Sequence, residues 1–469
     1  MSKKNKPRIL QDILIEEMVT DGKCLARFQD LIIFVQGVAP GDRADLRIIK
    51  HKKNYAEAVP LAIKEFSPLR IEPFCEHFGV CGGCKWQHLD YPTQLQFKQK
   101  QVTDALQRIG KVELPEISPI EGSELVSHYR NKLEFTFSND TWLTTGQIAT
   151  GQEFDKRSLG FHIPGRFDKI IDLQNCYLQP SPSNQIRSEL SKYVKAANIP
   201  FFDLVKQDGY LRNLIIRTAV TGQVMVILQV AQDNDEYLIP VMEFLSKRFP
   251  EITSLQYIIN NKKNETYHDL EVVCYKGLPY IEEQMEDLYF RVGPKSFYQT
   301  NSLQAVRLYQ ITRELAGLTG NEVVYDLYTG AGTIACFVAR NAKKVVGIEY
   351  VPSAIDDAKI NAAANNIGNC RFYAGDMADV LTDDLVLQHG KPDVIITDPP
   401  RAGMHEKVVK QLLKIAAPRI VYVSCNPGTQ ARDLALLDEL YKVIKVQPVD
   451  MFPQTHHVEN VVLLELRNK

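Results

Sequence analysis

The stretch Val-Val-Tyr-Asp-Leu-Tyr-Thr-Gly-Ala-Gly-Thr, residues 323–333, carries the most information about the fold. An apolar run ends at Asp326, and a turn with two glycines leads from it into a helical segment. Three further apolar runs follow, at residues 344–350, 393–398 and 420–425, with helical segments between them. Runs that are continuous in Val and Ile are typical of strands buried on both faces. The sequence therefore predicts an α/β domain with a mainly parallel sheet over residues 291–469.

The turn after the first of these strands predicts a nucleotide-like cofactor. Glycines let the backbone lie close to a ligand at the carboxyl end of a strand. Glu349 ends the second strand 17 residues after Gly332, where a carboxylate can accept hydrogen bonds from a ribose. Asp376, after the third strand, could hold an adenine edge. The glycine loop alone leaves a nicotinamide dinucleotide open, whereas the motifs at the fourth and fifth strands favour S-adenosylmethionine.

Those two motifs are Asp398-Pro399-Pro400-Arg401 and Cys425-Asn426-Pro427-Gly428. Since both follow parallel strands, we expect Asp398 and Cys425 to face one crevice. A thiolate that adds to carbon 6 of a uracil makes carbon 5 reactive enough to take a methyl group, and a base must then remove the carbon-5 proton. His456, His457 and Glu459 are the candidates for that base. On spacing alone, a solvated loop glutamate is as good an interpretation of Glu459.

The remainder of the chain predicts further domains. Short strands and turns over residues 8–68 indicate a small β-barrel, residues 91–121 a helical segment and residues 122–290 a β-rich domain with a helix near 236–248. Between the first two, residues 69–90 contain Cys75, Cys81 and Cys84, and the next cysteine along the chain is Cys176. Four thiolates suit zinc and an iron–sulfur cluster equally well.

Composition sets few limits on the partner. The net charge is −2, but the first 70 residues carry 13 Lys and Arg against 9 Asp and Glu. A local basic excess permits RNA binding without showing it. The beginning of the chain does not look like a signal peptide, and no apolar run is long enough to cross a membrane. We therefore expect a cytoplasmic protein without a membrane partner, and a monomer.

The motifs together resemble the RNA uracil-C5-methyltransferase family (the TrmA/RlmD type). The resemblance rests on residues 297–301, 326–333, 398–401, 424–427 and 457–459. It implies a Rossmann-like methyltransferase domain, Cys425 as nucleophile and Glu459 as base. It also implies S-adenosylmethionine contacts from Gln299, Tyr328, Glu349, Asp376 and Asp398. The target base would be flipped out of the RNA, and Tyr298 could stack on it.

The amino-terminal half resembles one branch of that family. Residues 8–68 look like a TRAM domain, an OB-like barrel that binds RNA. The branch that methylates 23S ribosomal RNA carries a [4Fe–4S] cluster at this cysteine spacing, which implies Cys75, Cys81, Cys84 and Cys176 as ligands. We therefore expect a ribosomal-RNA uridine-C5-methyltransferase. Transfer RNA is the alternative substrate, and an RNA-binding or ribosome assembly factor without turnover is the alternative of another class.

Overall fold

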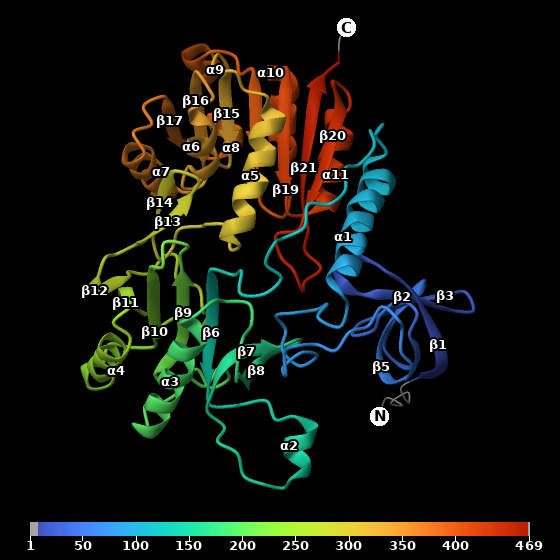
Figure 1. Cartoon of the computed structure of the whole chain (residues 1–469), viewed down its shortest axis with the longest axis vertical. Coiled ribbons are helices and arrows are strands. Elements are labelled where there is room, and N and C mark those ends of the chain that lie inside the picture. The colour runs from blue at the N-terminus through green and yellow to red at the C-terminus, as the bar shows by residue number, and fades with distance from the viewer. Residues whose placement is uncertain (1–7, 468–469) are drawn as a thin grey trace.

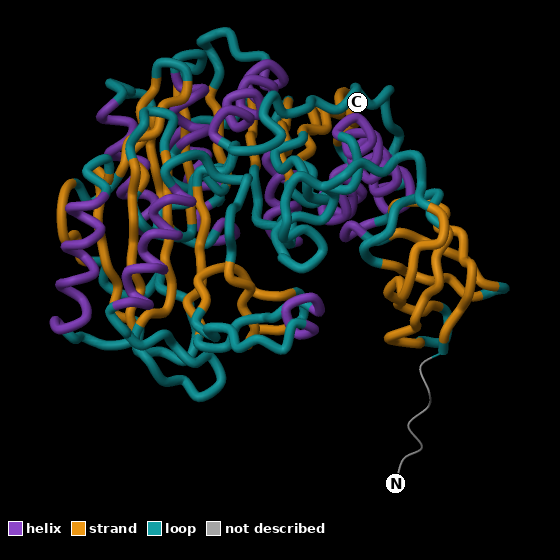
Figure 2. The backbone as a smooth tube through the Cα atoms, turned by 60° about the horizontal axis from the view of Figure 1, so that its bottom comes forward, coloured by secondary structure: helices purple, strands orange, loops and turns teal. Residues whose placement is uncertain are grey.

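The computed structural model describes residues 8–467, which form three sheet-based parts. Figure 1 shows the barrel at the lower right, the central domain at the lower left and the carboxyl-terminal domain above them. In the tube view of Figure 2 the barrel stands at the periphery of the molecule. In the part of the chain that the structure describes, no helix is long and apolar enough to cross a membrane.

The barrel closes in the strand order β1-β2-β3-β5-β4. Its strands are β1 (Ile9–Met18), β2 (Cys24–Phe28), β3 (Leu31–Val35), β4 (Arg43–His51) and β5 (Tyr55–Glu65). Side chains alternate between inside and outside along each strand, so residues such as Ile13, Ile15 and Ile33 fill the interior. Closure pairs the edge strands with each other and thereby satisfies their backbone groups.

A linker and one helix join the barrel to the rest. After residues 66–90, α1 (Tyr91–Ala105) begins at Asp90, whose side chain accepts a hydrogen bond from the Thr93 amide. The helix continues as a wider turn to Gly110 and ends where Lys111 takes a positive φ. Val102 and Leu106 are buried in the core of the carboxyl-terminal domain. The helix thus lies between that domain and the barrel, as Figure 1 shows.

The central domain is built on the sheet β12-β11-β10-β9-β6-β7-β8. These strands are β6 (Lys132–Ser138), β7 (Ser158–Ile163), β8 (Arg166–Asp172), β9 (Leu211–Thr218), β10 (Val224–Val230), β11 (Ile252–Ile259) and β12 (Val273–Gly277). Helices α3 (Ser183–Ala196) and α4 (Asp235–Arg248) pack on it, and short α2 (Thr145–Ala149) lies in a long loop. The predicted helix near 236–248 is confirmed.

The hairpin β13 (Ile281–Met285) and β14 (Leu288–Val292) leads into the carboxyl-terminal domain. Its sheet has the order β17-β16-β15-β18-β19-β21-β20. The strands are β15 (Val323–Leu327), β16 (Lys344–Glu349), β17 (Cys370–Ala374), β18 (Val394–Thr397), β19 (Arg419–Ser424), β20 (Tyr441–Val449) and β21 (Glu459–Leu466). The helices are α5 (Ser302–Ala316), α6 (Thr333–Ala339), α7 (Pro352–Ala364), α8 (Met377–Val380), α9 (Asp383–His389), α10 (Glu406–Ile415) and α11 (Pro427–Leu437).

This sheet is covered on both faces. Val324 and Val345 pack in the core beneath α5 and α6, whereas their neighbours Tyr325 and Val346 pack beneath α10 and α11. The five strands from β17 to β19 are parallel, and β21 inserts antiparallel between β19 and β20. The predicted fold class is confirmed, with an α/β domain, an OB-like barrel and a central β-rich domain.

Candidate active site

A cavity of about 1530 Å³ lies where the central domain meets the carboxyl ends of the parallel strands. Most of the residues predicted from the sequence line it, namely Gln299, Tyr328, Glu349, Asp398, Cys425 and Glu459. These side chains come from segments up to 160 residues apart. Four of them end or directly follow parallel strands, which end at the same edge of the sheet, whereas Gln299 precedes α5 and Glu459 begins the antiparallel β21. The cavity is therefore the candidate active site.

The glycine loop forms one wall of the cavity through an unusual backbone. Tyr328, Gly330 and Gly332 all have positive φ angles, of 64°, 55° and 78°. A β-carbon at Gly332 would lie 2.9 Å from the β-carbon of Ala358 on α7, so glycine is needed there for space as well as for conformation. The Gly330 amide donates to the Glu349 carboxylate across 3.2 Å. The loop and the acid at the end of β16 thus form one cradle, as a ribose-binding site requires.

Two predicted residues lie elsewhere. Asp376 lies outside the cavity lining, exposed at the start of α8, where its side chain accepts a hydrogen bond from the Ala378 amide at 2.9 Å. The stacking role expected for Tyr298 is wrong, because its side chain is only 7% exposed and packs beside Phe290 in the core. Its neighbour Phe297 is 69% exposed and lines the cavity instead. Neighbouring residues in extended backbone point to opposite sides, which the motif alone does not resolve.

The strand register brings Cys425 and Glu459 together. Ser424, the last residue of β19, pairs with Asn460 of β21, so the residues on either side of that pair are neighbours at the sheet edge. Glu459 is only 3% exposed. Burial raises its pKa well above the ordinary value, and the charge of Asp398 raises it further. Burial also raises the pKa of Asp398 to about 7.

The same surroundings act on the thiol. Burial and the charges of Glu459 and Asp398 raise the pKa of Cys425 to about 12, while Arg401 lowers it. Asp326, fully buried beneath the loop, has its pKa raised to about 7, mainly by burial. The site therefore holds a thiol that is protonated near pH 7, among carboxyl groups whose pKa values are raised.

Several cavity residues were not predicted as site residues. Arg130 reaches the cavity from the central domain, and Arg401, Phe452 and Thr455 from the carboxyl-terminal one. Arg401 directly follows the Asp-Pro-Pro motif, and this position would have allowed its prediction as a site residue. Phe452 and Thr455 belong to the loop before β21, whose course no sequence pattern indicated.

Of the two candidate histidines, His457 lines the cavity. His456 lies instead against the barrel, where a β-carbon at Gly22 would be 3.3 Å from its own. Burial lowers the pKa of both histidines to about 4, so each is neutral near pH 7. Of the three candidates for the base, Glu459 is thus the one that both lines the cavity and has a raised pKa.

The four candidate ligand cysteines line a second, small cavity together. They come from the linker and from the segment after β8, and the Gly83 amide points at the Cys81 sulfur, 3.4 Å away. Burial raises the pKa of Cys81 to about 11 and that of Cys84 to about 12. Among residues 8–467, no three His, Cys, Asp or Glu side chains are placed to hold a metal ion as they stand. The donor set itself, four thiols facing one space, suits zinc or an iron–sulfur cluster.

Comparison with known proteins identifies the family of the chain. The family "tRNA (Uracil-5-)-methyltransferase" matches residues 278–467, and the TRAM domain matches residues 7–61. A Bacteroides thetaiotaomicron protein described as "Uncharacterized RNA methyltransferase" is 59% identical over 96% of this chain and 100% of its own length. One from Porphyromonas gingivalis with the same description is 54% identical over 96% of this chain and 98% of its own.

A solved structure is similar over almost the whole chain. It is the Pyrococcus abyssi tRNA (uracil-54, C5)-methyltransferase in complex with S-adenosyl-L-homocysteine. The two chains are 28% identical with a TM-score of 0.75, covering 96% of this chain and 100% of the other. The present chain therefore belongs to the RNA uracil-5-methyltransferase family, as an S-adenosylmethionine-dependent RNA methyltransferase with an amino-terminal TRAM domain.

Proposed function

We propose that the protein methylates carbon 5 of a uridine in ribosomal RNA through a covalent bond between Cys425 and the base. The observation that carries this proposal is the pairing of β19 with β21, which sets Cys425 and Glu459 side by side at the edge of the cavity. A nucleophile and a base at adjacent strand ends can act on neighbouring atoms of one planar ring.

In the proposed reaction, the Cys425 thiol gives its proton to solvent water and the sulfur bonds to carbon 6 of the uracil. The electron pair of the carbon 5–carbon 6 double bond moves towards carbon 5 and the carbonyl at carbon 4. Carbon 5 would then bond to the methyl group of the cofactor's sulfonium, while the bond from that methyl group to sulfur would break and the cofactor would leave as a neutral thioether. Glu459 takes the proton from carbon 5, the double bond re-forms and the sulfur–carbon 6 bond breaks. Glu459 must be ionised for that step, and once ionised its carboxylate is a stronger base because its pKa is raised.

Four of the predicted residues would hold the cofactor in the cavity: Gln299, Tyr328, Glu349 and Asp398. Glu349 is placed beside the glycine loop, as a partner for ribose hydroxyls must be. Asp376, which lies outside the cavity lining at the start of α8, is the fifth proposed contact. Phe297 and Arg130 line the same space and offer a flat face and a positive charge to the flipped base and its phosphate.

For the second cavity we propose a [4Fe–4S] cluster held by Cys75, Cys81, Cys84 and Cys176. The donor set supports it, since four thiols face one space. Their raised pKa values mean that binding must displace protons, which makes assembly easier at higher pH. Methyl transfer requires no electron, so the role of this centre would be structural.

Ribosomal RNA is proposed because the cysteine set and the TRAM domain occur together in this chain. Transfer RNA is the second candidate, since the Pyrococcus abyssi structure described above is that of a transfer-RNA enzyme. Mass-spectrometric mapping of 5-methyluridine in both RNA classes, from cells with and without the gene, decides between them. Loss of a site in 23S RNA supports the proposal, and loss confined to transfer RNA supports the second candidate.

The mechanism is tested with RNA that carries 5-fluorouridine, because fluorine on carbon 5 cannot be removed as a proton. Wild-type protein should form an adduct that survives denaturation, and Cys425→Ala should form none and transfer no methyl group. Glu459→Gln should accumulate the adduct on ordinary uridine. Cys274→Ala, at an exposed cysteine on β12, is the control and should behave as wild type. If wild-type protein binds RNA but never transfers a methyl group, it is a binding factor without turnover.

A further inference from the structure

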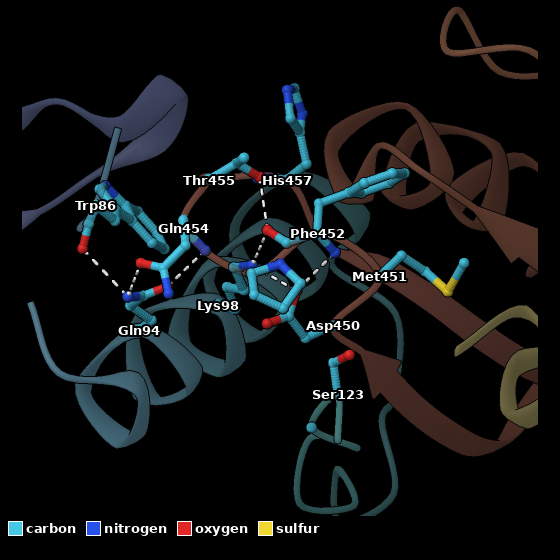
Figure 3. A network of polar contacts seen from close by, with 12 residues as sticks. Trp86, Gln94, Lys98, Ser123, Asp450, Met451, Phe452, Gln454, Thr455 and His457 are labelled. Atoms are coloured by element: carbon cyan, nitrogen blue, oxygen red, sulfur yellow. Dashed lines mark hydrogen bonds and ion pairs between the residues drawn. The ribbon is translucent and has the colours of Figure 1, made fainter. Parts of the chain in front are cut away.

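The loop between β20 and β21, residues 450–458, carries part of the candidate active site and is bonded to segments outside its own sheet. Phe452, Thr455 and His457 of this loop line the cavity, and Glu459 follows it directly. Its position therefore decides where these groups stand relative to Cys425. Figure 3 shows the loop lying across α1, with side chains from the helix pointing into it.

A fully buried ion pair fixes the beginning of the loop. The Lys98 amine on α1 donates to the Asp450 carboxylate at 2.6 Å, and both side chains are 0% exposed. The same amine donates to the Phe452 carbonyl at 3.0 Å. The second oxygen of Asp450 accepts from the Tyr91 hydroxyl at 2.9 Å, and its first also accepts from the Phe452 amide. Lys98 thus holds both the Asp450 carboxylate and the Phe452 carbonyl of the loop at one position of α1.

A second set of bonds fixes the middle of the loop. The Gln94 side chain exchanges two hydrogen bonds with Gln454, through the Gln454 amide at 2.9 Å and its side-chain oxygen at 3.0 Å. The Gln454 carbonyl accepts from the amides of Lys85 and Trp86, at 2.9 and 3.1 Å. Gln454 has a φ of 68°, a left-handed conformation that an ordinary residue keeps only where its surroundings hold it.

The bonds continue towards the catalytic groups. The Phe452 carbonyl, held by Lys98, also accepts from the Thr455 hydroxyl at 2.8 Å. That hydroxyl in turn accepts from the His457 amide at 3.3 Å. The chain of contacts therefore runs from α1 through Phe452 and Thr455 to His457, two residues before Glu459 (Figure 3). Lys85 and Trp86 follow Cys84 directly, so the segment next to the cysteine cavity holds the same loop.

We propose that Lys98 and Gln94 are positioning residues, which hold residues 450–458 so that Glu459 can take the carbon-5 proton. This proposal rests on the proposed function of Glu459. Neither side chain lines the cavity, so they act through the loop and not on the RNA or the cofactor. A displacement of about 1 Å in a reacting group can cost on the order of 100-fold in rate, so a loosened loop slows proton removal.

The test compares Lys98→Met, Gln94→Leu and the double variant Lys98→Met/Asp450→Leu with wild type. Single loss of Lys98 leaves a buried carboxylate without its cation and can impair folding, whereas the double variant removes both charges and keeps the volume apolar. Lys410→Met, which breaks the exposed pair with Glu406 on α10, is the matched control. Wild-type protein must first be shown to methylate uridine RNA. If it does not, the result contradicts the proposed function and not the positioning role of Lys98 and Gln94.

Each variant is measured for kcat, for the KM of S-adenosylmethionine and for the fraction of protein bonded covalently to uridine RNA during turnover. We expect the double variant and Gln94→Leu to lose tenfold or more in kcat, with KM within twofold and a raised covalent fraction, because removal of the proton is slowed after the bond to carbon 6 has formed. A purely structural role would lower kcat and the covalent fraction in proportion. That outcome, or a kcat within twofold of wild type, overturns the proposal.

Discussion

The raised pKa of Cys425 gives a prediction that can be tested on the protein without RNA. At pH 8, a thiol with the ordinary pKa of 9.0 is roughly 10% ionised, whereas one with a pKa of about 12 is roughly 0.01% ionised. The thiolate population is thus about 1000-fold smaller. A thiolate of higher pKa is also more nucleophilic. With a Brønsted coefficient of about 0.5, each Cys425 thiolate should react about 30-fold faster than a thiolate of ordinary pKa, which offsets part of the smaller population. Cys425 should therefore react roughly 30-fold more slowly than an unhindered thiol of ordinary pKa.

The assay follows modification of the Cys425 peptide by a small disulfide such as hydroxyethyl disulfide, read by mass spectrometry between pH 7 and pH 10. The rate should rise about tenfold per pH unit without levelling off, because the thiol remains far below half ionisation. A peptide thiol with a pKa near 9 provides the reference rate. A rate that levels off between pH 9 and pH 10 would show an ordinary thiol with a pKa near 9 and refute the reasoning.

Asp398→Asn supplies the matching change in charge. The pKa of Asp398 is about 7, so its carboxylate is charged over most of the assay range and raises the pKa of Cys425. Its removal should lower that pKa and speed the modification between pH 8 and pH 10. Methylation should fall in the same variant, since Asp398 is proposed to contact the cofactor. An unchanged rate of modification would mean that the two groups do not interact.

Three more predictions concern the cradle and the cysteines. Asp326 has a pKa of about 7 in the folded protein and 3.8 as its ordinary value, so its contribution to stability is complete below about pH 4 and is lost as the pH rises through 7. In Asp326→Asn, the free energy of unfolding measured in urea should not show this loss of about 4 kcal/mol. If the free energy of unfolding of the variant fell with pH as steeply as that of wild type, the raised pKa of Asp326 would be contradicted. Gly332→Ala should weaken binding of S-adenosylhomocysteine tenfold or more by calorimetry, because the added methyl meets Ala358, whereas Gly368→Ala, with open space around it, should bind as wild type. Anaerobically purified wild type should contain iron and sulfide in equal amounts and Cys84→Ser much less, and a colourless protein with zinc would replace the cluster assignment.

Much of this architecture can be predicted from local sequence. The continuous Val and Ile runs identify the buried parallel strands, and the glycines after Asp326 identify the sharp turn that places the cofactor. Cys425 and Asp398 are predictable site residues, because any residue that directly follows a parallel strand lies at the edge where all such strands end. These features depend on spacing along one segment, which is why the sequence alone carries them.

Other features depend on which distant segments meet. Tyr298 and Phe297 differ by one position, and only the packing against Phe290 decides which of them is buried. Glu459 lies beside Cys425 because β21 pairs antiparallel with β19, a pairing between residues that are 36 or more positions apart. Hydrophobic pattern does not encode strand order in a sheet that is buried on both faces, since every strand there looks alike.

The sequence by itself determined the fold class, the glycine loop and the candidate nucleophile Cys425 of this protein. The tertiary structure decided where the candidate base Glu459 lies and which residues contact the loop before it. Lys98 and Asp450 are separated by 352 positions, yet they form a fully buried pair at the beginning of the loop that leads to Glu459. The physical reason is that a charge enters the interior only where a partner from elsewhere in the chain meets it, and that meeting exists only in the folded molecule.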